Sequence, residues 1–275
     1  MSTAMTAAKT MSLVRGVFLL TALLVVAFPL VWVSLASFKT PVQLNDPSLI
    51  LFTPSLVNWQ YVLDAGILSA AGRSALVAGI TVTISAIVGS AAAYVISQYK
   101  AGGSATRFGI LAAQVLPPAV LVFPFLTLAY LLRVNDTLIP LIFAHLSFVM
   151  PVVTWFLIGF FDSVPKSLEE QARVDGFTRF QAFLLVVLPQ VYPGLGAAII
   201  FGFTLSWNDM FYGLILTPSK SAILPVAIAG FNTFRGVELG SMSAAILVAV
   251  IPVVIASFFI QKRLVQGISG GAVKY

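Results

Sequence analysis

The sequence predicts an all-α polytopic membrane protein, a class indicated by its composition and by the distribution of its charges. Of 275 residues, 59% are hydrophobic and 9% are charged, whereas a soluble domain carries about a quarter charged residues. The apolar residues gather in charge-free runs long enough to cross a bilayer, which takes about 20 residues as a helix. One charged island, residues 163–193, separates two of these runs. We therefore expect a single membrane domain, 1–275, with six transmembrane helices and one polar helix-turn-helix.

The composition also excludes several kinds of site. The chain has no cysteine and one histidine, so it offers no disulfide framework, no thiolate nucleophile and no histidine-based metal site. Its net charge of +6 comes from basic residues spread between the apolar runs. That distribution indicates a topology signal and not a nucleic-acid-binding patch. We expect neither a bound metal nor a nucleic-acid partner.

The charge-free runs define the six predicted crossings. Five runs are each interpreted as one helix: 16–38, 74–99, 108–132, 137–161 and 239–261. Another long run begins inside the charged island, so the fifth crossing is placed at 193–217. The third run contains Pro117, Pro118 and Pro124. Each proline removes a backbone hydrogen bond, so this helix is expected to be kinked.

The basic residues set the expected orientation. With the N-terminus inside, ten of the fifteen Lys and Arg residues lie in inside segments and five in outside loops, as the positive-inside rule requires. This orientation places both termini and the charged island in the cytoplasm. The first run has 23 residues, more than the apolar core of a signal peptide, so we expect an uncleaved anchor.

The longest outside loop is 39–73. It contains three prolines, which oppose a regular helix, and then Trp59 and Tyr61. Two interpretations stay open for this loop. It is either a plain connector with aromatic residues at the membrane interface or a contact surface for a soluble protein outside the membrane.

Two predicted helices carry small residues at every fourth position, a spacing that lets helix backbones approach closely in lipid. In the second crossing these residues are Thr81, Ser85, Gly89 and Ala93. In the fifth crossing they are Gly194, Ala198, Gly202 and Ser206. We interpret both stripes as packing faces, and the fifth-crossing stripe packs either within the chain or against a partner subunit.

The island 163–193, here called the charged loop, holds six charged residues within fourteen positions: Lys166, Glu169, Glu170, Arg173, Asp175 and Arg179. Ser167 has an acidic residue three positions later, which predicts a capping box that opens a helix at residue 168. Gly176 supplies the left-handed residue that ends this helix. Thr178 with Gln181 is a second capping box, and the second helix runs to about residue 187, because Leu188 precedes a proline. The charged loop is therefore predicted to form a helix, a tight turn and a helix.

Trp207, Asn208 and Asp209 lie in the outer half of the fifth crossing. A carboxylate at depth costs a few kcal/mol, so it is expected to face protein or a water-filled cavity. Aromatic, amide and carboxylate groups together suit a pocket that stacks on a ring and binds hydroxyl groups. A structural network near the outer interface is the alternative. His145 in the fourth crossing has no carboxylate nearby in the sequence, and we interpret it as structural.

The charged loop closely resembles the EAA loop of binding-protein-dependent ABC importer permeases. That pattern is Glu-Ala-Ala, three residues, Gly, nine residues, Ile, one residue and Leu-Pro. The corresponding residues here, at the same spacing, are Glu170-Gln171-Ala172, Gly176, Val186 and Leu188-Pro189. Gln171 replaces an Ala and Val186 an Ile. Neither departure changes the predicted helix-turn-helix, although Gln171 could alter the docking surface.

Three further stretches resemble the carbohydrate class of these permeases, the maltose-type smaller subunits. They are the glycine-rich tail 261–275, Trp207-Asn208-Asp209 with Phe211, and Leu224-Pro225-Val226. Arg73 stands where the class usually has an Asn before the second helix, so any role of that Asn does not carry over. The resemblance covers essentially the whole chain and implies sugar as the cargo.

The resemblance also implies a type I ABC importer permease fold and an assembly in the plasma (inner) membrane of a prokaryote. Two different permease chains would lie over two ATPase subunits, with an extracytoplasmic sugar-binding protein. The charged loop would couple ATPase closure to alternating access. Its implied coupling residues are Glu169, Glu170, Gln171, Ala172, Asp175, Gly176, Leu188 and Pro189. This chain lacks a phosphate-binding glycine loop, so it is not expected to be an enzyme, and ATP and Mg would bind to the ATPase.

Three alternative functions remain. The first is the same machine with a non-sugar cargo such as an amino acid, polyamine or phosphate. The second is an ion-coupled secondary transporter, which usually has inverted repeats and buried ionisable residues; here only Asp209 and His145 are candidates, and we find no repeat. The third is an intramembrane enzyme, for which no paired carboxylates are present. Loss of uptake on ATP depletion, with the ion gradient held, separates an ABC importer from an ion-coupled transporter.

Overall fold

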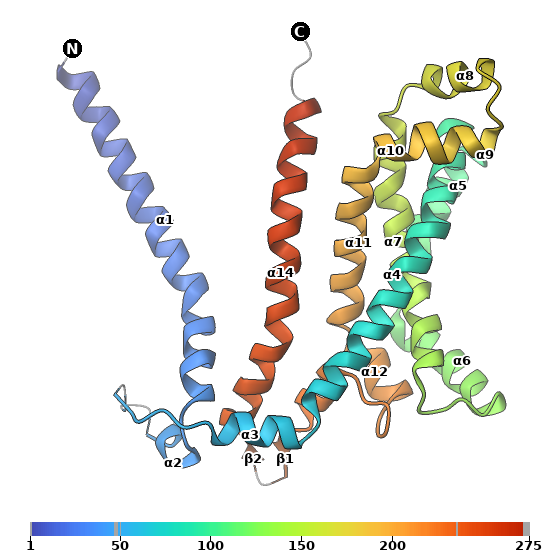
Figure 1. Cartoon of the computed structure of the whole chain (residues 1–275). Helices are drawn as coiled ribbons and strands as arrows, with labels where there is room; N and C mark the ends of the chain where they lie inside the picture. The colour runs from blue at the N-terminus through green and yellow to red at the C-terminus, as the bar shows by residue number, and fades with distance from the viewer. Residues whose placement is uncertain (1, 47–48, 50, 235, 272–275) are drawn as a thin grey trace. The chain divides into compact units, whose positions relative to one another are not determined.

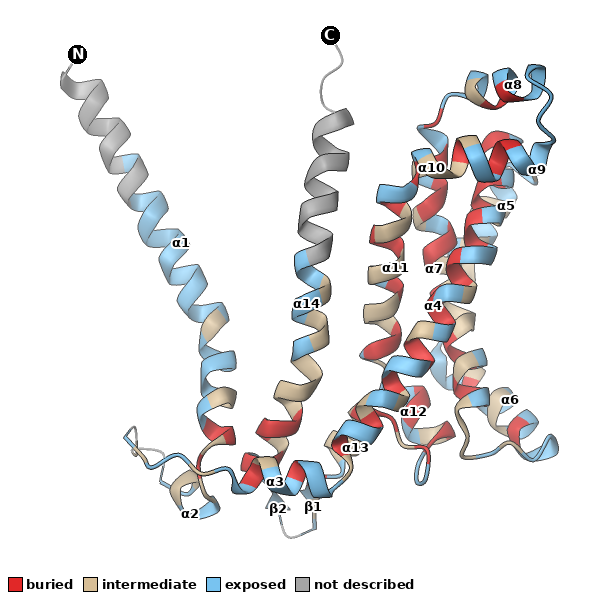
Figure 2. Cartoon of the chain, in the orientation of Figure 1, coloured by how far each residue is buried: buried red, intermediate tan, exposed pale blue. Residues whose placement is uncertain are grey.

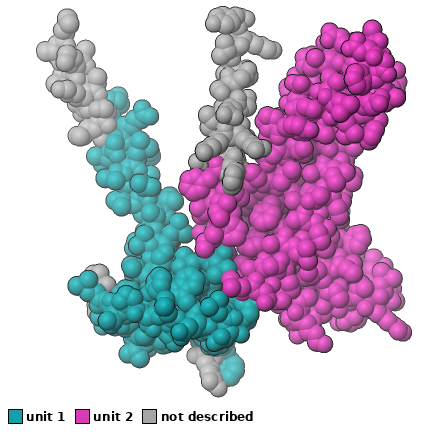
Figure 3. Space-filling model, in the orientation of Figure 1, with its two compact units in different colours: residues 1–67, 230–248 teal, residues 68–229, 249–275 magenta. Residues whose placement is uncertain are grey.

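The computed structural model describes residues 2–46, 49, 51–234 and 236–271, and the chain divides into two compact units (Figures 1 and 3). Unit 1 comprises Met1–Ile67 and Gly230–Val248, and unit 2 comprises Leu68–Ala229 and Ala249–Tyr275. Helix α14 (Leu239–Gly271) contributes its first turns to unit 1 and the remainder to unit 2.

Unit 1 is built around helix ends and a short hairpin. Its other elements are α1 (Ser2–Ser37), α2 (Pro41–Leu44), α3 (Val57–Asp64), β1 (Asn232–Thr233) and β2 (Gly236–Val237). The two strands pair antiparallel, with Asn232 opposite Val237. The buried amide of Asn58 donates to the carbonyl oxygens of Ser37 at 3.1 Å and Lys39 at 2.7 Å. This one side chain therefore ties α3 to the end of α1.

The prediction that prolines keep the 39–73 loop free of regular helix is wrong. Pro41 is the first residue of α2, where its missing N–H is not needed for helical hydrogen bonding. Thr40 and Gln43 complete a capping box in which each side chain bonds the other residue's backbone N–H. Helix α3 follows, and it contains Trp59 and Tyr61.

Unit 2 is a helical bundle in which α4 (Ile67–Gln98), α7 (Leu138–Asp162) and α11 (Tyr192–Trp207) lie side by side (Figure 1). At one end are α5 (Gly103–Ala112) and the helices of the charged loop, and at the other are α6 (Pro118–Leu131) and α12 (Phe211–Leu216). A short helix, α13 (Leu224–Ala229), follows α12. Buried residues line the facing sides of this bundle (Figure 2).

Both stripes of small residues pack inside unit 2. All eight stripe residues are buried. Gly89 faces Thr154 of α7, and a methyl group added at Gly202 would lie only 3.0 Å from Val153. At these distances between the helices a side chain larger than hydrogen would have to displace its neighbours, because well-packed interiors have no spare volume. Their interpretation as packing faces is confirmed, and the fifth-crossing stripe packs within the chain.

Four of the described helices are long and apolar enough to cross a membrane. A fifth span results if one bent pair of helices is counted as a single crossing. The four spans are Val14–Ser37, Ile67–Gln98, Leu138–Asp162 and Leu239–Phe258; the bent pair is Arg179–Gln190 with Tyr192–Trp207, at 79°. These spans correspond to the predicted first, second, fourth, sixth and fifth crossings. Helix α14 continues to Gly271, so residues 272–275 of the tail pattern lie outside the described residues.

The prediction of one kinked helix for the third crossing is wrong, because that segment is broken. Helix α5 ends at Ala112, and the 14-residue α6 begins only at Pro118. Between them Pro117 is extended, with φ −62° and ψ 133°, as expected of a residue that precedes proline. Consecutive prolines thus end one helix and start another.

Candidate functional site

The charged loop folds as a helix, a left-handed turn and a second helical segment. Helix α8 (Lys166–Val174) is followed by its C-cap, Asp175, and then by Gly176, whose φ is +91°. The N–H of Phe177 donates to the carbonyl of Ala172 at 3.0 Å, and that of Gly176 to Arg173 at 3.2 Å. These two bonds form a Schellman motif, which satisfies the last carbonyl groups of α8. The predicted role of Gly176 in ending the helix is confirmed.

The two predicted capping boxes have different outcomes. Thr178 accepts from the Gln181 N–H at 3.3 Å, and the Gln181 side chain accepts from the Thr178 N–H at 2.9 Å, so this box is confirmed as the start of α9 (Arg179–Ala182). The Ser167 box is wrong. Helix α8 already begins at Lys166 with Pro165 as its N-cap, so Ser167 lies inside the first turn. A proline with its fixed φ starts the helix without any side-chain cap.

The second helical segment does not end at Leu188, as the sequence predicted. Helix α9 leads into a π-helix, η1 (Phe183–Val187), and then into α10 (Leu188–Gln190). The Leu188 N–H donates to the carbonyl of Phe183, five residues back, and Leu188 itself is helical. The wider π turn carries the chain past Pro189, whereas a regular turn would place its ring against the preceding helix. The bend comes instead between Gln190 and Tyr192.

The side chains of the charged loop divide between two faces. Glu169 and Ala172 are buried, at 3% and 4% exposure. Leu188 and Pro189 are half-buried within the second segment. Four of the predicted coupling residues are exposed: Glu170, Gln171, Asp175 and Gly176. The exposed set forms the surface available to a partner, whereas Glu169 and Ala172 fix the loop to its own chain.

Glu169 anchors the charged loop to the end of α4. Its Oε1 accepts a hydrogen bond from the Tyr99 hydroxyl. The Arg179 guanidinium lies over the Tyr99 ring, 5.4 Å from its centroid. Burial, and next the hydrogen bond to Glu169, raise the pKa of Tyr99 above its usual value. The phenol therefore keeps its proton at neutral pH and remains a donor to the carboxylate. Tyr99 carries no local sequence signal of this role, because Glu169 lies 70 positions away.

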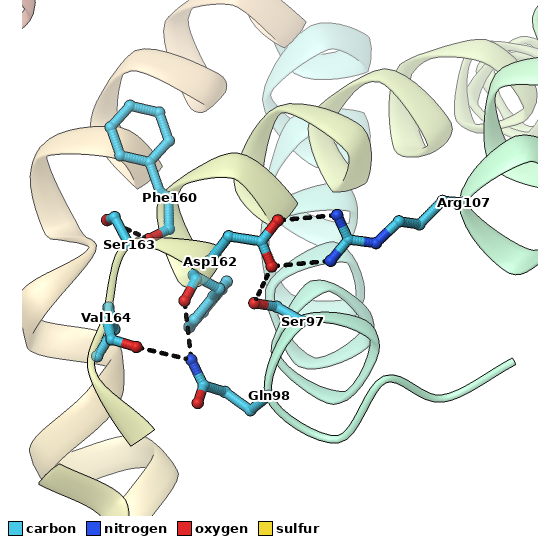
Figure 4. A network of polar contacts seen from close by, with 8 residues as sticks. Ser97, Gln98, Arg107, Phe160, Asp162, Ser163 and Val164 are labelled. Atoms are coloured by element: carbon cyan, nitrogen blue, oxygen red, sulfur yellow. Dashed lines mark hydrogen bonds and ion pairs between the residues drawn. The ribbon is translucent and has the colours of Figure 1, made fainter. Parts of the chain in front are cut away.

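A second set of contacts, here called the clamp, fixes the start of the charged loop (Figure 4). Gln98 Nε2 donates to the carbonyls of Phe161 at 2.8 Å and Val164 at 3.1 Å. The Asp162 carboxylate accepts from both terminal nitrogens of Arg107 at 2.8 Å and from the Ser97 hydroxyl at 2.6 Å. The ends of α4 and α7 are thus joined to the middle of α5 where the loop begins. No local sequence pattern indicates these contacts, because the partners are more than fifty positions apart.

The second candidate region is a break in the predicted fifth crossing. Helix α11 ends at Trp207, and α12 begins at Phe211. Trp207 is buried at 3% exposure and donates from Nε1 to the carbonyl of Ala249 at 3.1 Å, so it packs within the chain. Asn208 is exposed, and Asp209 is half-buried. The structure therefore places an amide and a carboxylate, without the indole ring, at the exposed side of the break.

His145 does have a carboxylate partner, which the sequence analysis did not find. Its Nε2 lies 3.2 Å from Asp209 Oδ2, and its Nδ1 lies 2.6 Å from Ser206 Oγ. The imidazole is fully buried. Only the packing of α7 against the end of α11 brings these residues together, since they are 61 to 64 positions apart. Among the described residues no three His, Cys, Asp or Glu side chains form a group that could hold a metal.

A bundle of apolar helices with a rigid charged loop at one end and a broken crossing at the other defines a membrane transport subunit. The chain belongs to the family described as "Binding-protein-dependent transport system inner membrane component", whose model matches residues 85–270. It is a multi-pass membrane protein of that family.

Named relatives and a solved structure agree with this assignment. The chain is 33% identical over 251 residues to the "Trehalose transport system permease protein SugB" of Mycobacterium tuberculosis, covering 90% of this chain and 92% of the relative. It is 28% identical to the "Trehalose/maltose transport system permease protein MalG" of Thermococcus litoralis, with 97% of each chain covered. Its fold is similar to a chain of a bacterial ABC transporter involved in the import of the acidic polysaccharide alginate. The TM-score is 0.76 and the identity 19%, with 92% of this chain and 96% of that chain covered. This likeness establishes the type I ABC importer permease fold.

Proposed function

We propose that this chain is a transmembrane permease subunit of an ATP-driven ABC importer for a sugar or sugar derivative. One observation carries the proposal: the charged loop is a folded helix-turn-helix with an exposed face, bound by Glu169 and the clamp to the ends of α4 and α7 and to the middle of α5. A loop held in this way moves together with the helices that it joins. A push on Glu170 or Gly176 therefore reaches the bundle. The relatives' names, which specify trehalose and maltose, support sugar as the cargo.

The proposed assembly contains a second, different permease, two ATPase subunits and an extracytoplasmic sugar-binding protein. The family description supports a binding protein as a partner. ATP and Mg bind to the ATPase subunits, so this chain is non-catalytic and carries no cofactor. The distribution of Lys and Arg supports cytoplasmic N- and C-termini in the inner membrane of a prokaryote.

In the proposed transport path, Asn208 and Asp209 line the route of the sugar, and Trp207 supports them from within the bundle. Helix α11 has 16 residues, so it is about 24 Å long, which is less than the ~30 Å thickness of the hydrocarbon core. Irregular backbone at membrane depth is tolerated where it is buried in protein or lines water. Because Asn208 is exposed in this chain, a water-filled path fits its environment.

The composition of the assembly and its energy source are tested together. The tagged chain is purified from native membranes, its partners are identified, and uptake of radiolabelled trehalose, maltose and diacetylchitobiose is measured. We expect an ATPase, a second permease and a binding protein, with uptake that stops on ATP depletion while the ion gradient is held. Purification without any ATPase, or uptake that follows the ion gradient alone, would favour a secondary transporter. An intact assembly that moves only a non-sugar solute would limit the error to the cargo.

The coupling role is tested at the exposed face of the charged loop. Glu170→Lys reverses a charge there, and Gly176→Val places a β-branched residue at a φ of +91°. Both variants should abolish uptake while the chain remains in the membrane. Gly176→Asn is the matched control, because asparagine tolerates the left-handed region. Normal uptake by both Glu170→Lys and Gly176→Val would rule out this face as the coupling surface.

A further inference from the structure

We propose that Asp209 Oδ1 and Asn208 form a subsite for sugar hydroxyl groups, and that His145 is the positioning residue that holds Asp209 there. This proposal rests on the proposed sugar-transport function. It assigns a role to the buried His145 and to Asp209 Oδ1, neither of which takes part in the proposed coupling to the ATPase.

The two carboxylate oxygens of Asp209 have different surroundings. Oδ2 accepts from His145 Nε2 at 3.2 Å and from the Gly213 N–H at 3.2 Å. Oδ1 accepts no hydrogen bond from any residue that the structure describes, and 12% of the side-chain surface is exposed. An ionised carboxylate can only accept. Oδ1 is therefore available to a donor that arrives from outside the chain.

His145 fixes which oxygen is left free. Because the carboxylate only accepts, the proton between the two residues lies on Nε2. The other ring nitrogen, Nδ1, is 2.6 Å from Ser206 Oγ, so both edges of the imidazole are engaged and the ring cannot turn without losing a contact. Phe148 and Tyr212 lie against the ring, with centroids 5.4 and 6.4 Å away. These contacts hold the imidazole, and through it Asp209, in one orientation.

The chemistry of the free groups selects the ligand class. A carboxylate oxygen accepts from hydroxyl or N–H donors, and the adjacent Asn208 amide can both donate and accept. The exposed Asn208 and the free Oδ1 belong to consecutive residues, so they can contact neighbouring hydroxyl groups of one sugar ring. A negatively charged ligand would meet the Asp209 carboxylate at this point. The subsite therefore fits a neutral polyhydroxyl compound.

The test uses the complete transport complex in proteoliposomes and compares trehalose with its monodeoxy analogues. Each sugar is supplied on saturating loaded binding protein, so the maximal rate reports the membrane subunits and not capture. Recognition by buried or oriented polar groups discriminates strongly against a ligand that lacks one hydroxyl. We expect the wild-type complex to move at least one deoxy analogue about tenfold more slowly than trehalose, the size of one charge-assisted hydrogen bond.

Two replacements of His145 separate positioning from bulk packing. The amide nitrogen of His145→Gln can reach the place of Nε2, so this variant should retain most of the discrimination. His145→Asn can replace only Nδ1, so it should bring the ratio of the two rates close to one. Thr204→Ala is the matched control, because among the described residues the Thr204 hydroxyl bonds only to Ile200 of its own helix. It should give the wild-type ratio.

Each remaining outcome decides the proposal. Equal discrimination in wild type, His145→Gln and His145→Asn, at equal amounts in the membrane, would overturn the positioning role. If His145→Asn does not accumulate, Ser206→Ala replaces it; loss of the Nδ1 partner should lower the ratio, and an unchanged ratio overturns the proposal. If the wild-type complex moves neither trehalose nor any other sugar of the uptake assay, the proposed sugar-transport function itself fails and the subsite falls with it.

Discussion

Gln98 joins the start of the charged loop to α4, and its replacement should loosen the loop. The side chain is 8% exposed, and its amide nitrogen bonds two carbonyl oxygens, those of Phe161 and Val164. Each such bond contributes about 1 kcal/mol net. Gln98→Ala should therefore destabilise the closed loop by about 2 kcal/mol. Gln98→Glu should destabilise it by more, because its carboxylate oxygen would face the two carbonyl oxygens and all three groups can only accept hydrogen bonds. A change of 2 kcal/mol raises the population of the opened loop about thirtyfold.

Trypsin cleavage within the charged loop measures this opening. Lys166 and Arg173 lie inside α8, so their peptide bonds are cut only after local opening, and the rate follows the opened fraction. The assay uses the purified complex in proteoliposomes and records uptake per ATP hydrolysed, which should fall in both variants. Ser163→Ala is the control, because the exposed Ser163 hydroxyl donates, within the part of the chain that the structure describes, only to Phe160 at the end of the same helix. Cleavage rates and coupling ratios equal to wild type in both Gln98 variants would refute the clamp.

Three further perturbations test the packing, the capping and one loop contact. Gly194→Ala places a methyl group 2.3 Å from the Phe160 ring, and such overpacking costs about 1–3 kcal/mol. The amount of folded chain in the membrane should therefore drop, whereas Gly159→Ala, with open space around it, should have no such effect. Thr178→Ala removes a confirmed cap worth about 1 kcal/mol and should speed trypsin cleavage of the loop several-fold, while an unchanged rate would mean that the cap contributes nothing. Burial alone would raise the pKa of Asp136, but hydrogen bonds from Lys220, Ser221 and Ser219 lower it below 3.8. A lowered folded-state pKa stabilises the protein above the unfolded value, and this stabilisation is lost as the pH falls through the folded pKa. Wild type should consequently lose thermal stability below about pH 4 more steeply than Asp136→Asn, and parallel pH profiles would contradict this account.

Local chemistry made several parts of the molecule predictable from the sequence. Gly176 is a left-handed helix stop because only its position and its missing side chain matter, and both can be read from neighbouring residues. The Thr178 capping box and the small-residue stripes are local in the same sense. The spacing of the charged loop also led to the family that the comparisons identify. Each of these predictions depends on residues within a turn or two of one another.

The failures have a different physical origin. The pairing of His145 with Asp209, and that of Tyr99 with Glu169, depends on tertiary packing between residues more than sixty positions apart. No local pattern encodes such a contact. The Leu188 prediction failed because a π turn lets the helix continue through the residue before Pro189. The Ser167 prediction failed because Pro165 already starts α8. Trp207 adjoins Asn208 in the sequence, but helical geometry turns its side chain to a different, buried side.

The π-helical turn at Phe183–Val187 makes the angular position of the charged loop depend on the exact number of residues in one short stretch. A π turn holds one more residue than the α-helical turn that it replaces. Deleting a single residue there, together with a Pro189→Ala replacement, would permit regular winding, and each α-helical residue turns the chain by about 100°. Helices α8 and α9 would then point in another direction relative to α11. The number of residues in this turn therefore determines the direction in which the loop points. Homologous permeases that differ by one residue at this place should present their loops to a partner from a different side.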